Sequence, residues 1–351
     1  MKALILVGGE GTRLRPLTTT LPKPLLPVAN VSFVERTLRR LAEVGCDEVV
    51  LSTCYKSEAF DHLAQRSEVR VRTVVESEPL GTGGAIGWAA RGFDERFLVL
   101  NGDVLTDVDL EWVISSHAAF AGEATIVLTP VDDPSRFGVV PTDDGSRVIE
   151  FVEKPAPGTA PTNMINAGTY VVEPGMLERI PSGRAVSVER EVFPAMAAEG
   201  VLFGLASDAY WLDFGTHATY LQANLDCLSG ALREPVPGRE LSPGAAVRVD
   251  DGVEVAPDAD IAGPAAIGAG TTVGAAASIG PDAVVGADVV IGEGAEVARS
   301  VLLDGAVIGA AARLDGVIVG GGGAVASGSV LGPGSVVPPG AGPVHVPRGG
   351  R

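Results

Sequence analysis

The sequence predicts two architectures in one chain: a doubly wound, mostly parallel α/β sheet, followed by a parallel β-helix of hexapeptide repeats. Two observations indicate this fold class. Short apolar runs alternate with helical patterns in the first two thirds of the chain, and an aliphatic residue recurs every six positions in the last third. In addition, every aromatic residue lies at or before Tyr220. Because the core of a small β-helix has no room for rings, we expect the architecture to change near residue 230.

The first part of the chain is expected to contain four strands and two amphipathic helices. The strands are predicted at 2–7, 48–51, 69–75 and 97–100, and the helices at 33–44 and 112–120. A sheet of this kind binds ligands at the carboxyl ends of its strands. Gly8-Gly9 and Asn101-Gly102-Asp103 directly follow apolar strands, so both are candidate site loops.

The last part of the chain repeats in phase nine times. Each repeat carries an aliphatic residue followed by Ala, Gly or Asp, at Val255, Ile261, Ile267, Val273, Ile279, Val285, Ile291, Val297 and Leu303. We expect each to point inward from a short face of a triangular coil, with small residues at the corners. The phase is expected to slip by one at Ile308 and to resume at Leu314. A disordered Gly/Ala-rich tail is the alternative, but it would not keep this phase.

These patterns divide the chain into three segments. Residues 1–230 form the α/β domain, 231–245 form a linker rich in Pro and Gly, and 246–351 form the β-helix with a C-terminal tail.

Composition excludes several classes of function. The formal net charge of −18 argues against a nucleic-acid partner and against an anionic membrane surface. Three cysteines without a CxxC pair argue against a disulfide framework or a zinc site. No apolar run reaches the roughly 18 residues that a membrane span needs. We therefore expect a cytoplasmic protein.

A glycine-rich loop follows the first strand. It reads Gly8-Gly-Glu-Gly-Thr-Arg-Leu-Arg-Pro16. Its glycines would let backbone N–H groups close on phosphate oxygens, and Arg13 would add a fork of donors. The spacing is neither that of a Walker loop nor that of a Rossmann loop. A glycine-rich turn without a ligand is the structural alternative.

Lysine usage strengthens the phosphate interpretation. Only four of the 26 Lys and Arg residues are lysine, and two of these, Lys23 and Lys154, directly precede a proline. A compact ammonium can reach one phosphate oxygen in a way that arginine would not reproduce. Taken singly, each lysine is better explained as a solvated surface charge, and only together with the glycine-rich loop do the two lysines favour a phosphate site.

Two carboxylates are candidate metal ligands. Asp103 follows an apolar strand and Asp213 lies in Trp211-Leu-Asp-Phe-Gly215. Two carboxylates together with substrate phosphates are a common way to hold Mg²⁺, although a lone Asp can also serve as a turn or helix cap. None of the four histidines has metal-ligand spacing, and no nucleophile arrangement for covalent catalysis is present.

A set of eight ordered motifs within residues 1–230 resembles the sugar-1-phosphate nucleotidylyltransferase family. The motifs are Leu6-Val-Gly-Gly-Glu-Gly-Thr-Arg-Leu-Arg-Pro16, Pro22-Lys-Pro-Leu-Leu-Pro27, Glu78-Pro-Leu-Gly-Thr-Gly-Gly84, Asn101-Gly-Asp103, Phe137-Gly-Val-Val140, Phe151-Val-Glu-Lys-Pro155, Ile165-Asn-Ala-Gly168 and Trp211-Leu-Asp-Phe-Gly215. The third and seventh motifs, together with Ser187-Val-Glu-Arg-Glu-Val-Phe-Pro194, look like the guanylyltransferases of that family. A β-helix after the catalytic domain is typical of the family, and the resemblance implies that it is left-handed.

The resemblance implies a role for each matching residue. Residues Leu6, Gly8, Gly9, Gly11, Thr12 and Arg13 would bind the nucleotide, and Glu78 and Gly83 would read its base. The sugar pocket would be lined by Gly138, Glu153, Lys154, Asn166 and Thr169. Catalysis would depend on Arg13, Lys23 and Asp103, and Asp103 and Asp213 would carry Mg²⁺.

The implied reaction joins GTP and mannose 1-phosphate to give GDP-mannose and pyrophosphate. Its substrates are small molecules, and the resemblance also implies a homo-oligomer. Three departures leave the sugar open, namely Asn30-Val-Ser-Phe33, Met164 and Gly215-Thr-His217. Valienol 1-phosphate or another C7-cyclitol 1-phosphate, or glucose 1-phosphate with another nucleoside triphosphate, would keep the same chemistry. A non-catalytic regulatory paralogue is the alternative from another class.

Overall fold

The computed structural model describes residues 1–344, which group by their contacts into two compact units. The first unit contains Met1–Glu10 and Val34–Trp211, and the second contains Gly11–Phe33 and the chain from Leu212 onward. The segment Gly11–Phe33 and the last part of the α/β segment are therefore grouped with the β-helix. The predicted boundaries at 230 and 245 stay a prediction.

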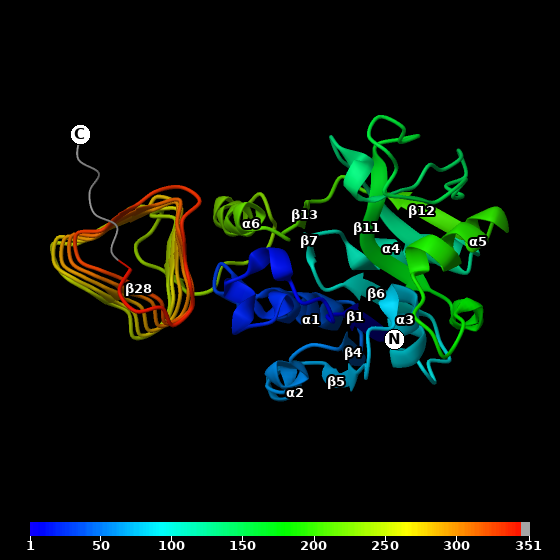
Figure 1. Cartoon of the computed structure of the whole chain (residues 1–351), viewed down its shortest axis with the longest axis horizontal. Coiled ribbons are helices and arrows are strands. Elements are labelled where there is room, and N and C mark those ends of the chain that lie inside the picture. Colours follow the sequence, from blue (N-terminus) through cyan, green and yellow to red (C-terminus); the bar gives the residue numbers. More distant parts are fainter. Residues whose placement is uncertain (345–351) are drawn as a thin grey trace. The chain divides into compact units, whose positions relative to one another are not determined.

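The first unit is built around a nine-stranded sheet. Its main strand order is β10-β9-β11-β6-β1-β4-β5, and β8 lies beside β11 and β12 beside β8. The strands are β1 (Lys2–Leu6), β4 (Glu48–Thr53), β5 (Arg70–Val75), β6 (Phe97–Asn101), β8 (Ala124–Pro130), β9 (Gly138–Val139), β10 (Val152–Glu153), β11 (Met164–Val172) and β12 (Leu202–Ala206). Figure 1 shows several of these strands beside one another.

The doubly wound fold is confirmed, and the sheet is mixed. Strands β5, β4, β1 and β6 are parallel neighbours, as are β8 and β12. Strand β11 runs antiparallel to both β6 and β8. The central strands β1 and β6 are largely apolar and buried, and Ala3, Leu4 and Ile5 have no exposed surface. The edge strand β5 is different, because it carries Arg70 and Arg72 and none of its residues is buried.

All four predicted strands and both predicted helices are present, with ends that differ by a few residues. The helices of this region are α1 (Phe33–Glu43), α2 (Leu63–Arg66), α3 (Gly81–Ala89), α4 (Leu110–Phe120) and α5 (Phe193–Ala198), and one π-helical turn is η7 (Val188–Val192). Helix α4 starts two residues before its prediction because the Asp109 carboxylate accepts a hydrogen bond from the N–H of Trp112 and caps the helix.

The β-helix consists of three parallel sheets, one on each side of its coils. The first contains β15 (Val247–Val249), β18 (Ala265–Ile267), β21 (Ala283–Val285), β24 (Val301–Leu302), β27 (Ile318–Val319) and β30 (Val336–Val337), preceded by the antiparallel β14 (Arg239–Glu240). The second contains β16 (Glu254–Val255), β19 (Thr272–Val273), β22 (Val290–Ile291), β25 (Val307–Ile308) and β28 (Ala324–Val325). The third contains β17 (Asp260–Ile261), β20 (Ser278–Ile279), β23 (Glu296–Ala298), β26 (Arg313–Asp315) and β29 (Val330–Leu331).

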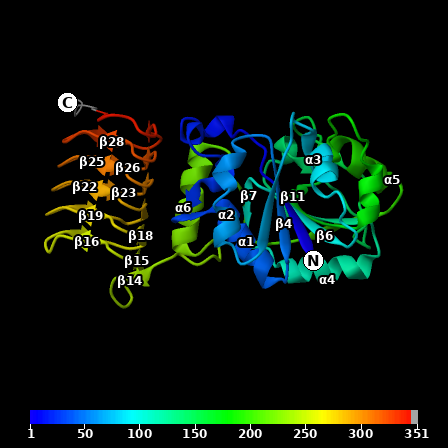
Figure 2. The same cartoon turned by 90° about the horizontal axis from the view of Figure 1, so that it is seen from below.

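The hexapeptide interpretation is confirmed by this left-handed β-helix. Figure 1 shows the coils end on with three short sides, and Figure 2 shows their strands stacked rung upon rung. Most of the predicted inward positions are buried, among them Ile279 and Val285, which have no exposed surface. Val255 and Ile261 are the exceptions, because each belongs to the first strand of its sheet; Val255 keeps 36% of its surface exposed, and Ile261 is only partly buried.

The predicted position of the phase slip was wrong. Val285 pairs with Leu302, not with Leu303, so the slip occurs before Leu302, well before Ile308. The cause is a shortened corner at Arg299-Ser300, where Arg299 takes a left-handed φ of 46° and the Ser300 hydroxyl donates to the Ala298 carbonyl at 2.6 Å. Leu302 therefore joins the β-helix core.

The second unit also contains the segment Gly11–Phe33 and helix α6 (His217–Ser229). The segment forms three short 3₁₀ turns, η1 (Thr12–Leu14), η2 (Leu17–Thr19) and η3 (Lys23–Leu25), and the ribbon β2 (Pro27–Val28) and β3 (Val31–Ser32). The Asn224 carboxamide of α6 accepts the N–H of Ala29 at 2.8 Å, and the side chain of Asn30 donates to the carbonyl of Val285 at 2.8 Å. These bonds fasten the segment to α6 and to the β-helix.

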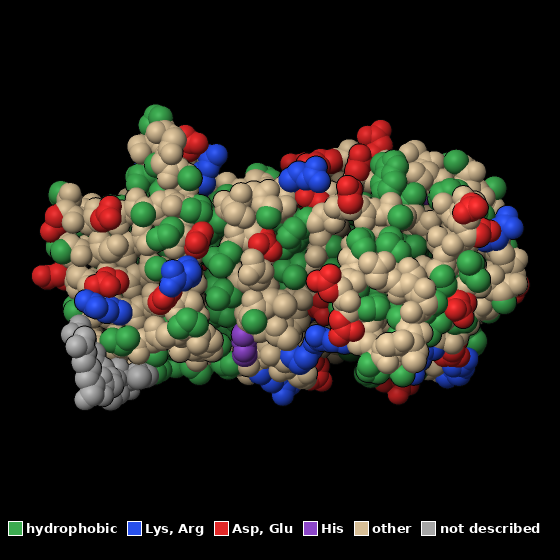
Figure 3. Space-filling view, turned by 90° about the horizontal axis from the view of Figure 1, so that it is seen from above, with side chains coloured by type: hydrophobic (Ala, Val, Ile, Leu, Met, Phe, Trp, Pro, Cys, Tyr) green, Lys and Arg blue, Asp and Glu red, His purple; other side chains and the backbone are tan. Residues whose placement is uncertain are grey.

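Charges are mixed on the surface. On the face drawn in Figure 3, basic side chains are interspersed with acidic ones and form no broad basic area. Within the described residues, no helix is both long enough and apolar enough to cross a membrane.

Candidate active site

The loop after β1 begins in the first unit. The N–H of Val7 donates to the carbonyl of Ser52 at 2.8 Å, which holds the start of the loop against the end of β4. Gly8 lies against Cys54, whose thiol donates to the Gly8 carbonyl at 3.2 Å, and Gly9 is exposed. Burial, with the nearby Glu76 carboxylate, raises the pKa of the Cys54 thiol, so the thiol stays protonated and can act as this donor.

The turn Asn101-Gly102-Asp103 lies beside the same edge of the sheet. The N–H of Gly102 donates to the carbonyl of Leu6, the last residue of β1, at 2.9 Å. A Cβ at Gly102 would lie 2.4 Å from that carbonyl oxygen, so only glycine permits this approach. The turn connects β6 to β7 (Val104–Thr106) and leaves the Asp103 side chain exposed. Asp103 thus follows the carboxyl end of a parallel strand, where ligands bind in such folds.

In the second unit the structure brings three predicted residues together. Asp213, at the end of β13 (Trp211–Asp213), has its two carboxylate oxygens near two cations. Lys23 Nζ lies 3.5 Å from Oδ1, and Arg13 Nη2 lies 3.8 Å from Oδ2. Lys23 is buried with its ammonium 4.7 Å above the centre of the Phe214 ring, whereas Arg13 is half exposed.

The same unit contains the rest of the predicted nucleotide loop. Gly11 precedes η1, and its carbonyl accepts the hydroxyl of Thr18 at 2.9 Å. Thr12 is the first residue of η1. The ring of His217 bonds the carbonyl of Leu14 through Nε2 at 3.1 Å, which fixes the end of η1 to the start of α6. The departure at Gly215-Thr-His217 therefore has a structural role.

Three residues of the predicted sugar pocket form one group in the first unit. Gly138 on β9 pairs directly with Glu153 on β10. The next residue, Lys154, has a positive φ of 51° and donates its N–H to the carbonyl of Phe137 at 2.9 Å. Its ammonium lies 3.3 Å from Glu153 Oε1 and is more than half exposed. The hairpin therefore presents a carboxylate and an ammonium side by side.

Asn166 and Thr169 lie on β11, at an irregularity in its pairing with β8. Asn166 Oδ1 accepts the N–H of Gly168, which has a φ of 77°, and Asn166 Nδ2 donates to the hydroxyl of Tyr170 at 2.9 Å. Asn166 still pairs with Leu128 of β8, and the register shifts between Asn166 and Tyr170. Thr169 is buried, with 2% of its surface exposed.

The two residues predicted to read the base lie near the start of α3 and differ in exposure. Glu78 is exposed. Gly83 is buried in α3, and its N–H donates to the carbonyl of Val186 at 2.9 Å. The N–H of Gly83 is thus already used in packing, and the assignment of this residue to the base stays a prediction without structural support.

Glu76 is a candidate that sequence reasoning missed. It follows β5, has 8% of its surface exposed, and accepts hydrogen bonds from the Ser52 hydroxyl at 2.9 Å and from the N–H of Leu80 at 3.0 Å. The sequence contained a signal for this residue, because Glu76 directly follows the carboxyl end of the parallel strand β5, as Gly102 follows β6.

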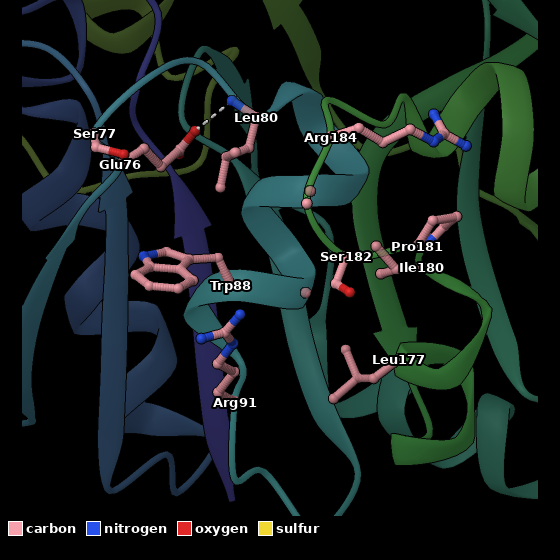
Figure 4. A pocket seen from close by; sticks show the side chains of 13 residues that line it. Glu76, Ser77, Leu80, Trp88, Arg91, Leu177, Ile180, Pro181, Ser182 and Arg184 are labelled. Atoms are coloured by element: carbon pink, nitrogen blue, oxygen red, sulfur yellow. Dashed lines mark hydrogen bonds between the residues drawn. The ribbon is translucent and has the colours of Figure 1, made fainter.

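A cavity of about 290 Å³ lies along the outer side of α3. Figure 4 shows Trp88 of α3 and Arg91, which follows that helix, on one side and Leu177, Ile180 and Pro181 on the other. Of the residues assigned a role from the sequence, none lines this cavity; only Glu76 lies both here and at the sheet edge.

Asp103 and Asp213 carry carboxylate oxygens, which are the donor atoms that a hard divalent metal such as Mg²⁺ prefers. Within residues 1–344 there is no group of three or more His, Cys, Asp or Glu side chains that could hold a metal ion. Mg²⁺ takes oxygen ligands, keeps several waters, and is usually bound by one or two carboxylates with substrate phosphates. Asp103 and Asp213 each offer such a carboxylate.

Comparison with known proteins identifies a family for each of the two parts of the chain. The Nucleotidyl transferase family matches residues 2–230, and the GMPPB C-terminal domain matches residues 245–340. Mannose-1-phosphate guanylyltransferase of Mycobacterium tuberculosis is 41% identical over 260 residues, which cover 69% of this chain and 72% of that protein. Probable mannose-1-phosphate guanylyltransferase 1 of Oryza sativa is 40% identical, covering 70% of each chain.

Solved structures share the fold of the first part. The crystal structure of HddC from Yersinia pseudotuberculosis has a TM-score of 0.55 and 32% sequence identity, covering 64% of this chain and 97% of HddC. A second crystal structure of HddC, complexed with GMP-PN, has a TM-score of 0.54. The resemblance of the eight motifs is thus confirmed over the segment that carries them. The chain belongs to the Nucleotidyl transferase family, among proteins in which that domain is followed by a GMPPB C-terminal domain.

Proposed function

We propose that this protein is an Mg²⁺-dependent mannose-1-phosphate guanylyltransferase, which makes GDP-mannose and pyrophosphate from GTP and mannose 1-phosphate. The observation that carries the proposal is the pairing of Lys23 and Arg13 with Asp213, because these three residues lie far apart in the sequence and the chemistry needs such cations. The names of the relatives at about 40% identity support the choice of GTP and mannose 1-phosphate.

The reaction transfers a nucleotidyl group between two anions. A phosphate oxygen of the sugar 1-phosphate attacks the α-phosphorus of GTP, a new P–O bond forms, and the bond to the departing pyrophosphate breaks in line with it. The attacking oxygen is already ionised, so the protein needs neither a base nor a nucleophile. The barrier is the repulsion between the two anions, which positioned cations lower.

Each of three cations is proposed to bind a different phosphate of the two substrates. Arg13 can grip the departing pyrophosphate with its planar fork, and the buried Lys23 offers a point charge to the phosphates at the reacting centre. The exposed Lys154, beside Glu153, is suited to bind the phosphate of the sugar. Backbone N–H groups of Gly8, Gly9, Gly11 and Thr12 would complete the nucleotide loop after Leu6.

Asp103 and Asp213 are the proposed metal ligands. When bound, Mg²⁺ would neutralise charge that develops on the phosphates. Asp213 also orients Lys23 and Arg13, because its carboxylate lies near both cations. An exposed Asp103 is consistent with a ligand that meets its metal only together with substrate.

Recognition of the two substrates is assigned to the first unit. Glu78, with Gly83, would read guanine, since a carboxylate can accept the N–H donors that guanine has and adenine lacks. Gly138, Glu153, Asn166 and Thr169 would line the sugar pocket. We also propose a cytoplasmic location, supported by three free cysteines, and a homo-oligomer.

Pyrophosphate release tests the proposal. We would measure it with Mg²⁺ for four nucleoside triphosphates against mannose, glucose and heptose 1-phosphates and a C7-cyclitol 1-phosphate. The highest kcat/KM is expected for GTP with mannose 1-phosphate. A higher value for another pair would move the substrate and keep the mechanism, whereas no release with any pair would indicate the regulatory paralogue.

A further inference from the structure

Glu189 lies on η7, a single π-helical turn in the first unit. Turns of this kind are rare and are frequent at functional sites. The turn contacts α3, which begins just after Glu78, and β10, which carries Glu153. Glu189 therefore belongs to an element that touches both the base-side motif and the sugar-side hairpin.

The Glu189 carboxylate is held on one side only. Its Oε2 accepts the hydroxyl of Thr82 at 2.6 Å and the hydroxyl of Ser187 at 2.7 Å. The Thr82 hydroxyl itself accepts the N–H of Val188 at 3.0 Å. This second bond fixes the orientation of the hydroxyl that donates to Glu189. The second oxygen, Oε1, accepts no hydrogen bond from residues 1–344, and no cation in that range pairs with it. The Glu189 carboxylate is therefore held in place through Oε2, and its Oε1 can accept a hydrogen bond from a ligand.

The surroundings of Glu189 include the asparagine assigned to the sugar. The hydroxyl of the buried Tyr170 accepts a hydrogen bond from Asn166 at 2.9 Å. Burial, and to a lesser extent the negative charge of Glu189, raise the pKa of Tyr170. Tyr170 is therefore bonded to Asn166 and lies within the electrostatic reach of Glu189.

The chemistry of the group suits a sugar. An ionised carboxylate only accepts hydrogen bonds, and sugar hydroxyls are donors of suitable size. A site built to bond a hydroxyl rejects an analogue that lacks it, because its own polar group is then left unpaired. A purely structural role, in which Glu189 connects α3 to η7, would need only the bonded Oε2. Ligand binding would also use Oε1.

We propose that Glu189 is a specificity-determining residue, and that its carboxylate accepts a hydrogen bond from one hydroxyl of the sugar 1-phosphate. Thr82 and Ser187 are positioning residues that aim the carboxylate. The inference rests on the proposed function, because it names a further contact of the same sugar site.

The test compares wild-type protein with Glu189→Gln, using mannose 1-phosphate and its 2-, 3-, 4- and 6-deoxy analogues. We expect KM for mannose 1-phosphate to rise about 10-fold in the variant, with KM for GTP changed less than twofold. For one deoxy analogue, the wild type and the variant should agree within about threefold, since the hydroxyl that Glu189 binds is missing there. An equal effect of the substitution on all five sugars would overturn the proposal.

Two further variants separate recognition from folding. Glu191→Gln makes the same change in the same turn, at an exposed residue paired with Arg184, and should leave every KM within twofold. Thr82→Val removes the hydroxyl that aims Glu189 and should show a smaller rise for the same sugars. Loss of GTP binding in both Glu189→Gln and Thr82→Val would assign Glu189 to the scaffold and refute the inference. A wild type that releases no pyrophosphate would instead refute the proposed function.

Discussion

The role proposed for Lys23 depends on its ion pair with Asp213, which is distant in the sequence. Lys23 is one of only four lysines, and its burial near Asp213 keeps a positive charge inside the second unit at a fixed place. A buried charge is tolerated when it is paired, and Asp213 and the Phe214 ring both favour this ammonium. A cation held in this way needs little reorganisation when phosphates arrive.

At this scale we predict that Asp103→Asn abolishes turnover without affecting the fold. The substitution removes the proposed metal ligand, which is exposed, and leaves the core unchanged, so kcat should fall about 1000-fold while Tm shifts by less than ~2 °C. Pyrophosphate release and thermal unfolding measure the two effects. Asp144→Asn, at an exposed turn residue, is the matched control and should match wild type in both. Undiminished turnover in Asp103→Asn would exclude the metal assignment.

The direction of the parallel strands determines which side chains lie at the same edge of the sheet. The carboxyl ends of β1, β5 and β6 carry Gly8, Glu76 and Asp103, because parallel strands all end on the same side of the sheet. At the opposite ends of the strands, His117 of α4 is buried between Thr125 and Glu173. The same Glu173 carboxylate accepts hydrogen bonds from Arg96.

This buried histidine predicts a pH dependence of stability. Burial lowers the pKa of His117 below its ordinary 6.5, so the unfolded chain takes up a proton in mildly acid solution and the folded chain does not. The contribution to stability is complete above pH 6.5 and is lost as the pH falls below it, by at most about 1.4 kcal/mol per pH unit. Glu173 adds a loss below pH 4.5, because its hydrogen bonds from Arg96 and His117 outweigh burial and lower its pKa.

Urea unfolding at pH 8, 7, 6 and 5 measures this dependence. The free energy of unfolding should fall more steeply between pH 6.5 and 5 in wild type than in His117→Gln, which has no group that titrates there. Equal slopes for the two proteins would show that another group is responsible.

At the scale of the whole molecule, the β-helix offers a surface for the proposed self-association. Val290 and Val307 occupy paired positions on β22 and β25, and each keeps more than 40% of its surface exposed. Adjacent exposed valines favour burial against a second apolar surface. The chain carries a net charge of −18, so added carboxylates here should oppose association further.

We predict that Val290→Glu with Val307→Glu dissociates the proposed homo-oligomer. Sedimentation velocity of the full chain should show a species of lower mass, with pyrophosphate release largely retained. Ser278→Glu with Asp260→Asn, on another side of the β-helix, keeps the charge closer to wild type and should leave the mass unchanged. An unchanged mass in the double valine variant would place the contact on a different surface.

The sequence by itself determined the elements and the contiguous loops. Strands, helices and β-helix coils follow from hydrophobic periods that are local to each segment, and Gly8-Gly9 and Asn101-Gly102-Asp103 stand out because they follow apolar strands directly. The family resemblance had the same origin, since each motif is a short run. A hydrophobic period predicts an element correctly because the positions that it marks as apolar lie on one face of that element, and this face packs against the core.

Only the tertiary structure decided how distant segments meet. It paired Lys23 and Arg13 with Asp213, grouped Gly11–Phe33 with the C-terminal part of the chain, and brought Glu189 near Tyr170. It also moved the β-helix slip to Leu302, where a corner lost one residue. These outcomes depend on the path of the chain and on close packing between segments, and no period or motif within a single segment carries that information.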